Sequence, residues 1–322
     1  MKRVAVLTSG GDASTMNKCL STLVTYAAKF DCEIYFVKEG YKGLYENQIY
    51  KADLNETRSW WKLPGTKIYS SRFPQILDSG IKEQMAQNLE ANQIDCLIVI
   101  GGDGSYKGAS LLSSIGTNVI CLPGTIDNDV TSTTYSIGFD TALNTIVNAI
   151  TEIKSCMDSH QTIGFVEIMG RHCIDLTVFA AIATESDIII TPESFYTPQE
   201  LLARINQLRQ TITRSLMVLY VENFLGTDNI PSAQEYVSYI HQNSKELVKK
   251  NVLGYMQRGG VPTAMDLYRS SLMCVAALKL INQNTYNKII GIKNDFPTVY
   301  GLKEGLEMKN PSRKGLIEVF FK

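Results

Sequence analysis

Short, almost continuously apolar runs, separated by segments of helical length, restrict the fold of this 322-residue chain more than any other feature. Strands of a parallel sheet that is covered by helices on both faces have such continuous apolar sequences, because neither face contacts solvent. The pattern predicts an α/β protein with doubly wound, mainly parallel sheets. We expect strands at Val4–Leu7, Cys96–Ile100, Asn118–Leu122, Gly164–Ile168, Ile188–Thr191 and Leu216–Val221, and helices at Lys18–Lys29, Ile81–Asn92, Thr141–Met157 and Pro198–Ile212.

The charge balance excludes several classes of partner. The net charge is -1, from 31 basic and 32 acidic residues, whereas nucleic-acid and membrane-surface proteins are strongly basic. No stretch approaches the ~20 apolar residues of a membrane span, and the N-terminal apolar run is too short for a signal peptide. The seven cysteines form no Cys-x-x-Cys pair, which argues against a disulfide framework or a zinc site. We therefore expect a cytoplasmic protein with no nucleic-acid or membrane partner.

Three glycine-containing loops follow predicted strands. They read Thr-Ser-Gly-Gly-Asp up to Asp12, Gly-Gly-Asp-Gly-Ser up to Ser105, and Pro-Gly-Thr-Ile-Asp-Asn-Asp up to Asp129. Glycines let a backbone approach a phosphate, and a following helix offers unpaired N–H groups. Each loop alone also fits an ordinary turn, and none is a Walker A loop or a dinucleotide fingerprint. Together, the three loops favour phosphoryl transfer, which needs a phosphate cradle, a metal, a base and cations.

Five side chains could supply that chemistry. Asp103 offers the hard oxygen ligand that Mg²⁺ prefers. Asp127 and Asp129 could act as a general base and its metal or water partner, or form only a solvated Asx turn. Arg72 and Arg171 are candidate cations, although each taken singly also fits a surface or ion-pair residue.

The order of these motifs, continued by Glu-Ile-Met-Gly-Arg and Gln-Arg-Gly-Gly, resembles bacterial ATP-dependent 6-phosphofructokinases from Val4 to about Asn294. The resemblance implies two Rossmann-like lobes, usually in a homotetramer, that phosphorylate the 1-hydroxyl of fructose 6-phosphate in glycolysis. We expect an ATP-binding lobe at 1–138 plus about 257–306, and a sugar-phosphate lobe at 139–256 plus about 307–322.

The resemblance also implies a role for individual residues. Asp127 would be the base, with a catalytic set completed by Thr125, Asp129, Arg171, Arg72 and Gly11. ATP would contact Gly11, Tyr41, Arg72, Phe73, Gly102, Asp103, Gly104 and Ser105, and Asp103 would hold Mg²⁺. The sugar phosphate would contact Thr125, Asp127, Met169, Gly170, Arg171, Glu222, Lys249, Tyr255 and Arg258.

Two glycines predict the phosphoryl donor. In the pyrophosphate-using branch of the family, the residue after Gly-Gly-Asp tends to be aspartate and the one before Thr-Ile-Asp-Asn-Asp tends to be lysine. Here they are Gly104 and Gly124. An aspartate at the first position would crowd and repel the α-phosphate of ATP, so we expect ATP as the donor.

Departures from the family concentrate on sugar-phosphate binding. Two arginines that reach a neighbouring subunit's substrate are replaced by Thr162 and by Lys249 or Lys250, and a histidine is replaced by Tyr255. Lysine offers phosphate a point charge rather than a bidentate fork. Each lost charge-assisted bond costs roughly 1.5–3 kcal/mol, so two losses predict a substrate constant raised about a hundredfold or more.

The effector site that the resemblance implies is also depleted. Most positions where the family carries basic residues are neutral here: Ser21, Thr25, Leu54, Thr211 and Thr213. Only Lys154 is basic at a matching position. We therefore predict weak or absent control by nucleoside diphosphate and phosphoenolpyruvate.

Three functions remain open at this point. The first is a working ATP-dependent 6-phosphofructokinase with reduced sugar-phosphate affinity. The second is a kinase of another sugar or phosphosugar, which Thr162 and Tyr255 motivate. The third is a noncatalytic or regulatory subunit in a mixed assembly with an active paralogue, against which the intact base Asp127 argues.

Overall fold

The computed structural model describes residues 1–227, 229–309 and 311–322. These residues form two compact units, one made of residues 1–142 and 258–310 and the other of residues 143–257 and 311–322. Each unit is built around its own sheet, in which most neighbouring strands are parallel. The expected α/β class with mainly parallel sheets is confirmed.

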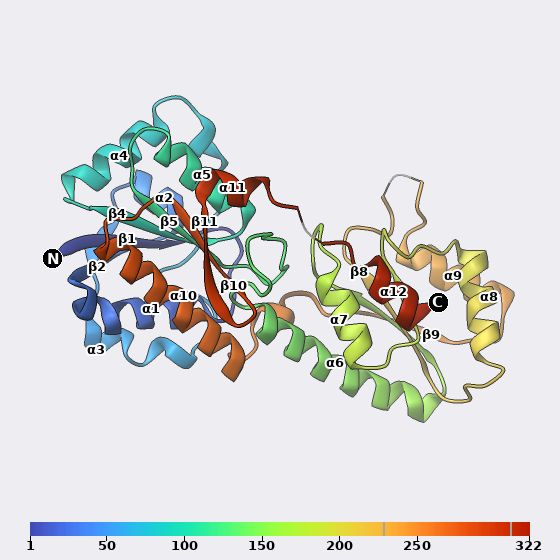
Figure 1. The fold of residues 1–322 in the computed structure, drawn as a ribbon. Helices are drawn as coiled ribbons and strands as arrows, with labels where there is room; N and C mark the ends of the chain where they lie inside the picture. Colours follow the sequence, from blue (N-terminus) through green and yellow to red (C-terminus); the bar gives the residue numbers. More distant parts are fainter. Residues whose placement is uncertain (228, 310) are drawn as a thin grey trace. The chain divides into compact units, whose positions relative to one another are not determined.

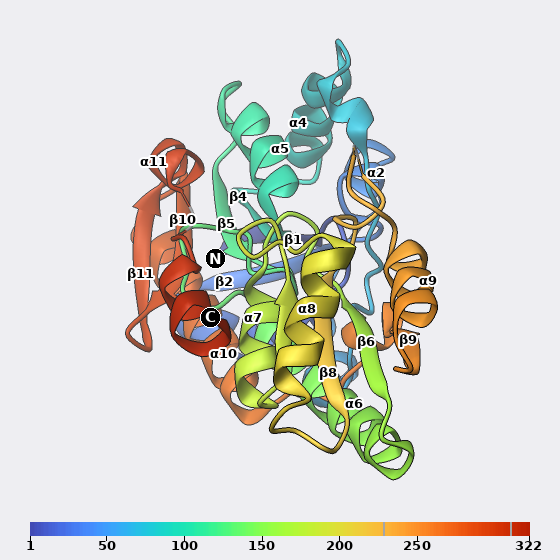
Figure 2. The same cartoon turned by 90° about the vertical axis from the view of Figure 1, so that its right-hand side faces the viewer.

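The first unit is built on a seven-stranded sheet. In sheet order, its strands are β11 (Phe296–Gly301), β10 (Lys288–Lys293), β5 (Val119–Pro123), β4 (Cys96–Gly101), β1 (Lys2–Thr8), β2 (Cys32–Val37) and β3 (Ile49–Lys51). The outermost strands β11 and β3 are antiparallel to their neighbours, and the other strands run parallel. Figure 2 shows the β10–β11 pair at one edge of the sheet.

Helices cover both faces of this sheet (Figure 1). Helices α2 (Gly40–Tyr45), α4 (Ile81–Ala91), α5 (Asp103–Ser113) and α11 (Leu302–Glu307) share one apolar core with the strands. Helices α1 (Met16–Tyr26) and α10 (Ala264–Asn282) pack against each other on the opposite face. The remaining short helices are η1 (Ala27–Phe30), α3 (Leu54–Thr57), η2 (Trp60–Lys62) and η3 (Pro74–Leu77).

The second unit contains a four-stranded, all-parallel sheet. Its strands, in sheet order, are β7 (Ile188–Ile190), β8 (Leu216–Val221), β6 (Ile163–Ile168) and β9 (Val248–Val252). Its helices are α6 (Phe139–His160), which starts in the first unit, α7 (Asp175–Ala183), α8 (Pro198–Leu208), α9 (Ala233–Asn243), η4 (Gly254–Arg258) and α12 (Lys314–Phe321). Helices α8 and α9 enclose an apolar core with β6, β7 and β8.

Local chemistry explains several helix boundaries. Helices α8 and α9 both begin with a capping box, formed by Thr197 with Glu200 and by Ser232 with Glu235. Helix α8 ends at Leu208, four residues before its expected end. The side chain of the next residue, Arg209, bonds the backbone carbonyls of Ile212 and Arg214, which closes a turn where the helix was expected to continue. The six expected strands are present with boundaries shifted by at most two residues.

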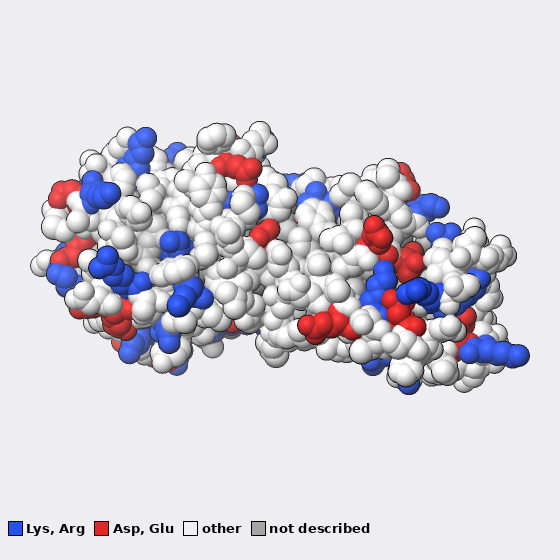
Figure 3. All heavy atoms as spheres, turned by 90° about the horizontal axis from the view of Figure 1, so that it is seen from below, with Lys and Arg blue, Asp and Glu red and all other residues white. Residues whose placement is uncertain are grey.

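The surface shows no dominant charge on the face drawn in Figure 3. There, Lys and Arg side chains are interspersed with Asp and Glu side chains on both units. Among the described residues, no helix is long and apolar enough to cross a membrane.

Candidate active site

The three glycine loops lie side by side at one edge of the first sheet. They follow β1, β4 and β5, which are neighbours in the order β5-β4-β1 and run parallel. Backbone hydrogen bonds join them in pairs: Ser9 N–H donates to Ile100 O (3.0 Å), and Gly124 N–H donates to Gly101 O (3.0 Å). The carboxyl edge of a parallel sheet is where α/β proteins bind ligands. The loops predicted separately from the sequence therefore form one continuous surface.

A fourth segment, residues 69–73, is tied to the first loop. Gly10 N–H donates to Ser71 O (3.3 Å), and the Ser70 hydroxyl donates to Gly10 O (2.7 Å). These bonds hold Arg72 and Phe73 next to the Gly10–Gly11 turn. Arg72 is exposed, as a cation must be to meet a dissolved anion, whereas the half-buried Phe73 packs against the apolar core.

The second loop enters helix α5 with Asp103 in its first turn. The Asp103 carboxylate is about half exposed and lies 2.6 Å from Lys107 Nζ, one helical turn along. A Cβ at Gly104 would meet no heavy atom of the described residues within 4 Å, whereas one at Gly101 would come within 2.7 Å of Ser9 O. Gly101 is therefore required by close packing, and Gly104 leaves open space above the loop.

Tyr41 is a buried residue that is hydrogen-bonded to this loop. Its side chain is 3% exposed, and its hydroxyl donates to Ser105 O at 2.6 Å. Burial raises the pKa of Tyr41 well above its ordinary value. The ring also packs against Gly108, where a Cβ would come within 2.9 Å of it. Tyr41, expected at the ATP site, thus holds Ser105 and the start of α5 in place.

The third loop buries its polar residues. Thr125 is 9% exposed and Asp127 is 7% exposed, and Asp127 N–H donates to Thr125 Oγ1 (3.1 Å). Between the two acids, Asn128 has a positive φ of 56° and accepts a hydrogen bond from Ser136 N–H (2.9 Å). Asp129 is half-buried. A shielded carboxylate beside a hydroxyl, on a loop anchored from several sides, suits a general base.

Arg258 reaches the first loop from the Gln-Arg-Gly-Gly motif. Its Nη1 donates to Asp12 O (3.0 Å) and lies 3.9 Å from the carboxylate of Asp12. The Ser14 hydroxyl donates to Arg258 O (2.7 Å). A Cβ at Gly11 would stand 2.4 Å from Arg258 Nη1, so the absence of a side chain at Gly11 makes room for the guanidinium.

In the second unit, the Met-Gly-Arg turn follows β6 and lies beside the end of β8. The N–H groups of Gly170 and Arg171 both donate to Glu222 Oε1, at 3.1 Å and 3.0 Å. Met169 N–H donates to Gln257 Oε1 (3.0 Å). A cavity of about 210 Å³ opens here, lined by Arg171, His172, Ile174, Pro192, Val221, Glu222, Asn223 and Phe224.

The positions that depart from the family differ in their surroundings. Lys249 and Lys250 are both exposed on edge strand β9, and as successive strand residues they point to opposite faces of the sheet. Tyr255 is 84% exposed. Thr162, by contrast, is 2% exposed, and its hydroxyl lies 3.1 Å from Met157 Sδ. Thr162 is therefore a buried residue of this unit.

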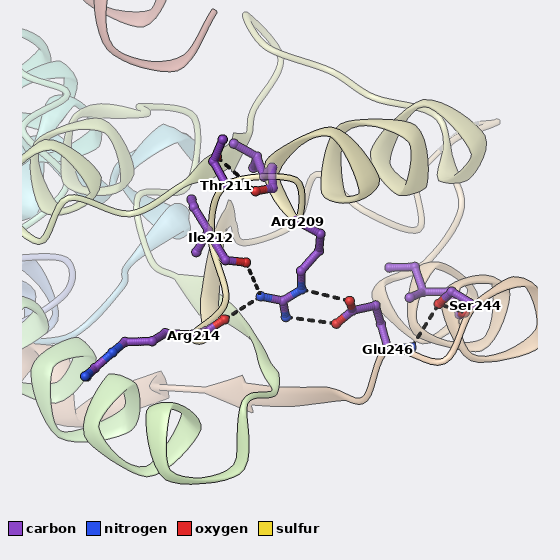
Figure 4. A network of polar contacts seen from close by, with 8 residues as sticks. Arg209, Thr211, Ile212, Arg214, Ser244 and Glu246 are labelled. Carbon is purple, nitrogen blue, oxygen red and sulfur yellow. Dashed lines mark hydrogen bonds and ion pairs between the residues drawn. The ribbon is translucent and has the colours of Figure 1, made fainter.

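An internal ion pair holds the turn whose sequence includes the expected effector positions Thr211 and Thr213 (Figure 4). Arg209 donates to both carboxylate oxygens of Glu246 (2.8 Å and 2.9 Å). The same guanidinium bonds the backbone carbonyls of Ile212 and Arg214. Both partners are largely buried, and the pair raises the pKa of Arg209. This cation closes the 209–214 turn and is already engaged by protein groups.

Sequence reasoning overlooked two site residues, Lys107 and Gln257. Lys107 stands four residues after Asp103, a spacing that places both on one helix face and could have revealed the pair. Gln257 belongs to the Gln-Arg-Gly-Gly motif, but only the arginine of that motif received a role. Its burial and its bond to Met169 depend on long-range contacts that no local pattern encodes.

One carboxylate is suited to a divalent metal in this region. Among the described residues there is no cluster of three or more His, Cys, Asp or Glu that could form an all-protein metal cage. Mg²⁺ at nucleotide sites is bound by one or two carboxylates together with phosphate oxygens and water, so a cage is not required. The accessible carboxylate of Asp103, at the mouth of the second loop, fits that pattern.

Comparisons with known proteins agree with this geometry. The family profile described as Phosphofructokinase matches residues 3–281. The chain is 67% identical over 321 residues to a probable ATP-dependent 6-phosphofructokinase of Malacoplasma penetrans, covering 100% of both chains. It is 40% identical over 320 residues to an ATP-dependent 6-phosphofructokinase of Photobacterium profundum, covering 99% of this chain and 98% of that one.

Solved structures show the same fold. A Pichia pastoris phosphofructokinase in the T-state superposes with a TM-score of 0.88 at 29% identity, over 95% of this chain. The chain spans only 37% of that longer protein. A pyrophosphate-dependent phosphofructokinase from Marinobacter aquaeolei, at 18% identity and a TM-score of 0.86, covers 100% of this chain and 92% of its own. This chain belongs to the phosphofructokinase family.

Proposed function

We propose that this protein transfers the γ-phosphoryl group of ATP to the 1-hydroxyl of fructose 6-phosphate, giving fructose 1,6-bisphosphate and ADP. The observation that carries the proposal is the bonded set of three strand-end loops in the first unit. It includes the Gly124–Gly101 backbone bond, which sets the loop of Thr125 and Asp127 beside the loop of Asp103. Phosphoryl transfer depends chiefly on such positioning.

In this proposal, ATP binds to the first unit. Its phosphates lie against the Gly11 loop and against the start of α5, from Gly102 to Ser105, where helix N–H groups favour an anion. Arg72 approaches from the segment bonded to Gly10. The open space around Gly104 supports ATP rather than pyrophosphate as the donor, because an aspartate there would occupy it.

Asp103 would hold Mg²⁺, which supplies positive charge to the phosphate oxygens as the phosphoryl group moves. The Asp103 carboxylate, which contacts Lys107 Nζ at 2.6 Å, would be the protein ligand of this ion.

Asp127 would take the proton from the sugar 1-hydroxyl as its oxygen attacks the γ-phosphorus. Burial excludes bulk water from this carboxylate, and the Thr125 hydroxyl fixes its backbone. A positioned base contributes roughly 10²- to 10⁴-fold to the rate. Thr125, Asp129, Arg171 and Arg72 would surround the transferring group, and the two arginines would offset its negative charge.

The sugar phosphate would contact Met169, Gly170, Arg171, Glu222, Lys249, Tyr255 and Arg258. We propose that its affinity is lowered compared with relatives that carry arginine at positions 162 and 249. Thr162 supports this view because its side chain is buried against Met157. Lys249 keeps a charge but lacks the guanidinium fork.

We further propose that the chain works in the cytoplasm as a homotetramer, or in a mixed assembly with a paralogous subunit. The exposed lysines on edge strand β9 support a contribution to a neighbouring copy. Regulation by nucleoside diphosphate or phosphoenolpyruvate would be weak, because most of the expected effector positions are neutral and the nearby cation Arg209 is engaged by Glu246. Hyperbolic fructose 6-phosphate saturation with and without these effectors is expected, and a clear sigmoidal response would contradict this.

The test uses the purified chain alone, with Mg²⁺, ATP and a panel of phosphosugars including fructose 6-phosphate. ADP release with fructose 6-phosphate as the preferred acceptor, abolished in Asp127→Ala, supports the proposal. A different preferred acceptor would make the protein a kinase of another phosphosugar. The absence of turnover with every sugar, restored by Lys249→Arg with Tyr255→His at exposed positions, would indicate a subunit that depends on a partner.

A further inference from the structure

Gln257 is a polar side chain with no exposed surface, beside residues proposed to grip the substrate. It is 0% exposed and makes two hydrogen bonds within the second unit. Its Oε1 accepts from Met169 N–H (3.0 Å), and its Nε2 donates to Gly254 O (3.0 Å). One amide group therefore joins the turn after β6 to the turn that carries Tyr255. A buried amide is costly unless it is hydrogen-bonded, and here both its oxygen and its nitrogen have a partner.

The turn that Gln257 holds has a strained backbone. Gly170 has a φ of 152°, and a Cβ there would come within 2.3 Å of Cys173 O. Arg171 has a φ of 55°, in the left-handed region that L-residues disfavour. Such conformations persist only where surrounding contacts fix them. A loss of those contacts would let the backbone relax and redirect the Arg171 side chain.

Three consecutive N–H groups of this turn are bonded to side chains from elsewhere in the unit. Met169 N–H is bonded to Gln257, and the N–H groups of Gly170 and Arg171 are bonded to Glu222. Because these N–H groups already have protein partners, they hold the turn in place. A sugar phosphate would meet the other atoms that the turn presents, including the exposed Arg171 side chain.

We propose that Gln257 is a positioning residue for the sugar-phosphate site. It locks the 169–171 turn to the 254–257 turn, so that Arg171 and Tyr255 are presented in one fixed arrangement. This inference rests on the proposed function in assigning that site to the sugar phosphate. The contact itself, a bridge between two turns, stands independently of which substrate binds.

Glutamine is the residue type that this bridge needs. A glutamate can still accept from Met169 N–H but has no donor for Gly254 O. A methionine matches glutamine in length and fills the buried space but makes neither bond. Gln257→Met therefore removes both contacts with little loss of volume, and Gln257→Glu removes one.

The experiment compares Gln257→Met and Gln257→Glu with a matched control, Ser215→Ala. Ser215 is 4% exposed in the same unit, and its hydroxyl donates to Asp158, away from both turns. For each protein, KM and kcat are measured for fructose 6-phosphate, along with KM for ATP. Hydrogen exchange of the Met169, Gly170 and Arg171 amides is followed without any ligand.

In Gln257→Met we expect KM for fructose 6-phosphate to rise about tenfold or more, the effect of losing one well-placed contact to the substrate. KM for ATP should stay unchanged within about twofold. Exchange of the three amides should accelerate by at least about tenfold. Gln257→Glu should show smaller changes of both kinds, and it carries the test if Gln257→Met does not fold. Ser215→Ala should change neither quantity.

The inference is overturned if a folded Gln257 variant keeps the wild-type KM and amide exchange, or if Ser215→Ala raises KM equally. If the wild-type protein does not phosphorylate fructose 6-phosphate, the proposed function fails, and amide exchange alone then decides the bridge. Faster exchange in Gln257→Met would support the bridge in that case, and unchanged exchange would reject it.

Discussion

Replacing Gly11 with alanine should weaken sugar-phosphate use while leaving the fold intact. Gly11 does not have a positive φ, so its backbone accepts alanine without strain. The added Cβ would stand 2.4 Å from Arg258 Nη1 and 3.2 Å from Arg258 Cζ. The clash therefore falls on the guanidinium proposed to bind the sugar phosphate.

The structure sets the size of the effect. Ordinary contact to a Cβ begins at 3.4 Å, so Nη1 must retreat by about 3.4 − 2.4 = 1.0 Å, far enough to break its 3.0 Å bond to Asp12 O. A displaced guanidinium also loses its charge-assisted bond to the substrate phosphate, worth roughly 1.5–3 kcal/mol. At ~1.4 kcal/mol per decade, KM for fructose 6-phosphate should rise about 10- to 150-fold.

The assay measures KM for both substrates together with the melting temperature. Gly315→Ala in α12 is the control, because a Cβ there meets no atom of the described residues within 4 Å and no site residue lies in that helix. The melting temperature of Gly11→Ala should fall little, since the clash involves the end of a flexible side chain. A Gly11→Ala variant with an unchanged KM for fructose 6-phosphate, or with only its KM for ATP raised, would refute the reasoning.

Three further perturbations test other parts of the protein. Lys107→Met should lower the Mg²⁺ concentration that half-saturates ATP binding by about 1.4- to 5-fold in calorimetry, because the exposed ion pair with Asp103 that competes with the metal is worth roughly 0.2–1 kcal/mol. An unchanged Mg²⁺ dependence would contradict this. Gly104→Asp should raise KM for ATP at least tenfold, because the new carboxylate would repel the ATP phosphates at close range in a site of intermediate dielectric. The melting temperature should not fall, since the added side chain meets no described residue within 4 Å of its Cβ. Unaltered ATP affinity would count against ATP lying at this loop. Asp266, a buried residue of α10, accepts hydrogen bonds from Gly138 N–H (3.0 Å) and from the Thr141 hydroxyl (2.6 Å). Burial raises the pKa of Asp266, so its charged form destabilises the fold progressively as pH rises above the ordinary value of about 3.9. In urea unfolding, the stability that Asp266→Asn loses relative to wild type should therefore shrink between pH 4.5 and 7.5, and a loss that grows with pH would show that the pKa is lowered instead.

Six of the buried parallel strands were predictable because they read as nearly unbroken apolar runs. Strands such as β4 and β8 are buried at every residue and stand out without any structure. Edge strand β9 was not predicted, because its sequence, Val-Lys-Lys-Asn-Val, is mostly exposed and lacks that pattern. The antiparallel edge strand β11 is likewise only partly buried. Burial, rather than position in the sheet, decides what the pattern reveals, since the buried edge strand β7 was predicted. The interior strands β2 and β10 were not predicted, because Glu33 interrupts the apolar run of one and Gly291 and two flanking lysines that of the other.

The loops of the candidate site were predictable, but the directions of its side chains were not. Parallel strand order brings Asp12, Asp103 and Asp127 to one edge, which three strand-glycine junctions already suggest. Whether a side chain faces solvent or the core depends on contacts distant in sequence. For that reason Thr162 and Gln257 could be found buried only in the folded chain.

The central claim is that a complete phosphoryl-transfer centre uses Asp127 as its base. The most direct measurement is kcat for ATP-dependent phosphorylation of fructose 6-phosphate by the wild-type chain and by Asp127→Asn, with ATP binding measured in parallel. The account predicts that kcat falls roughly 10²- to 10⁴-fold while ATP affinity is retained. An Asp127→Asn variant that keeps the wild-type kcat would contradict it.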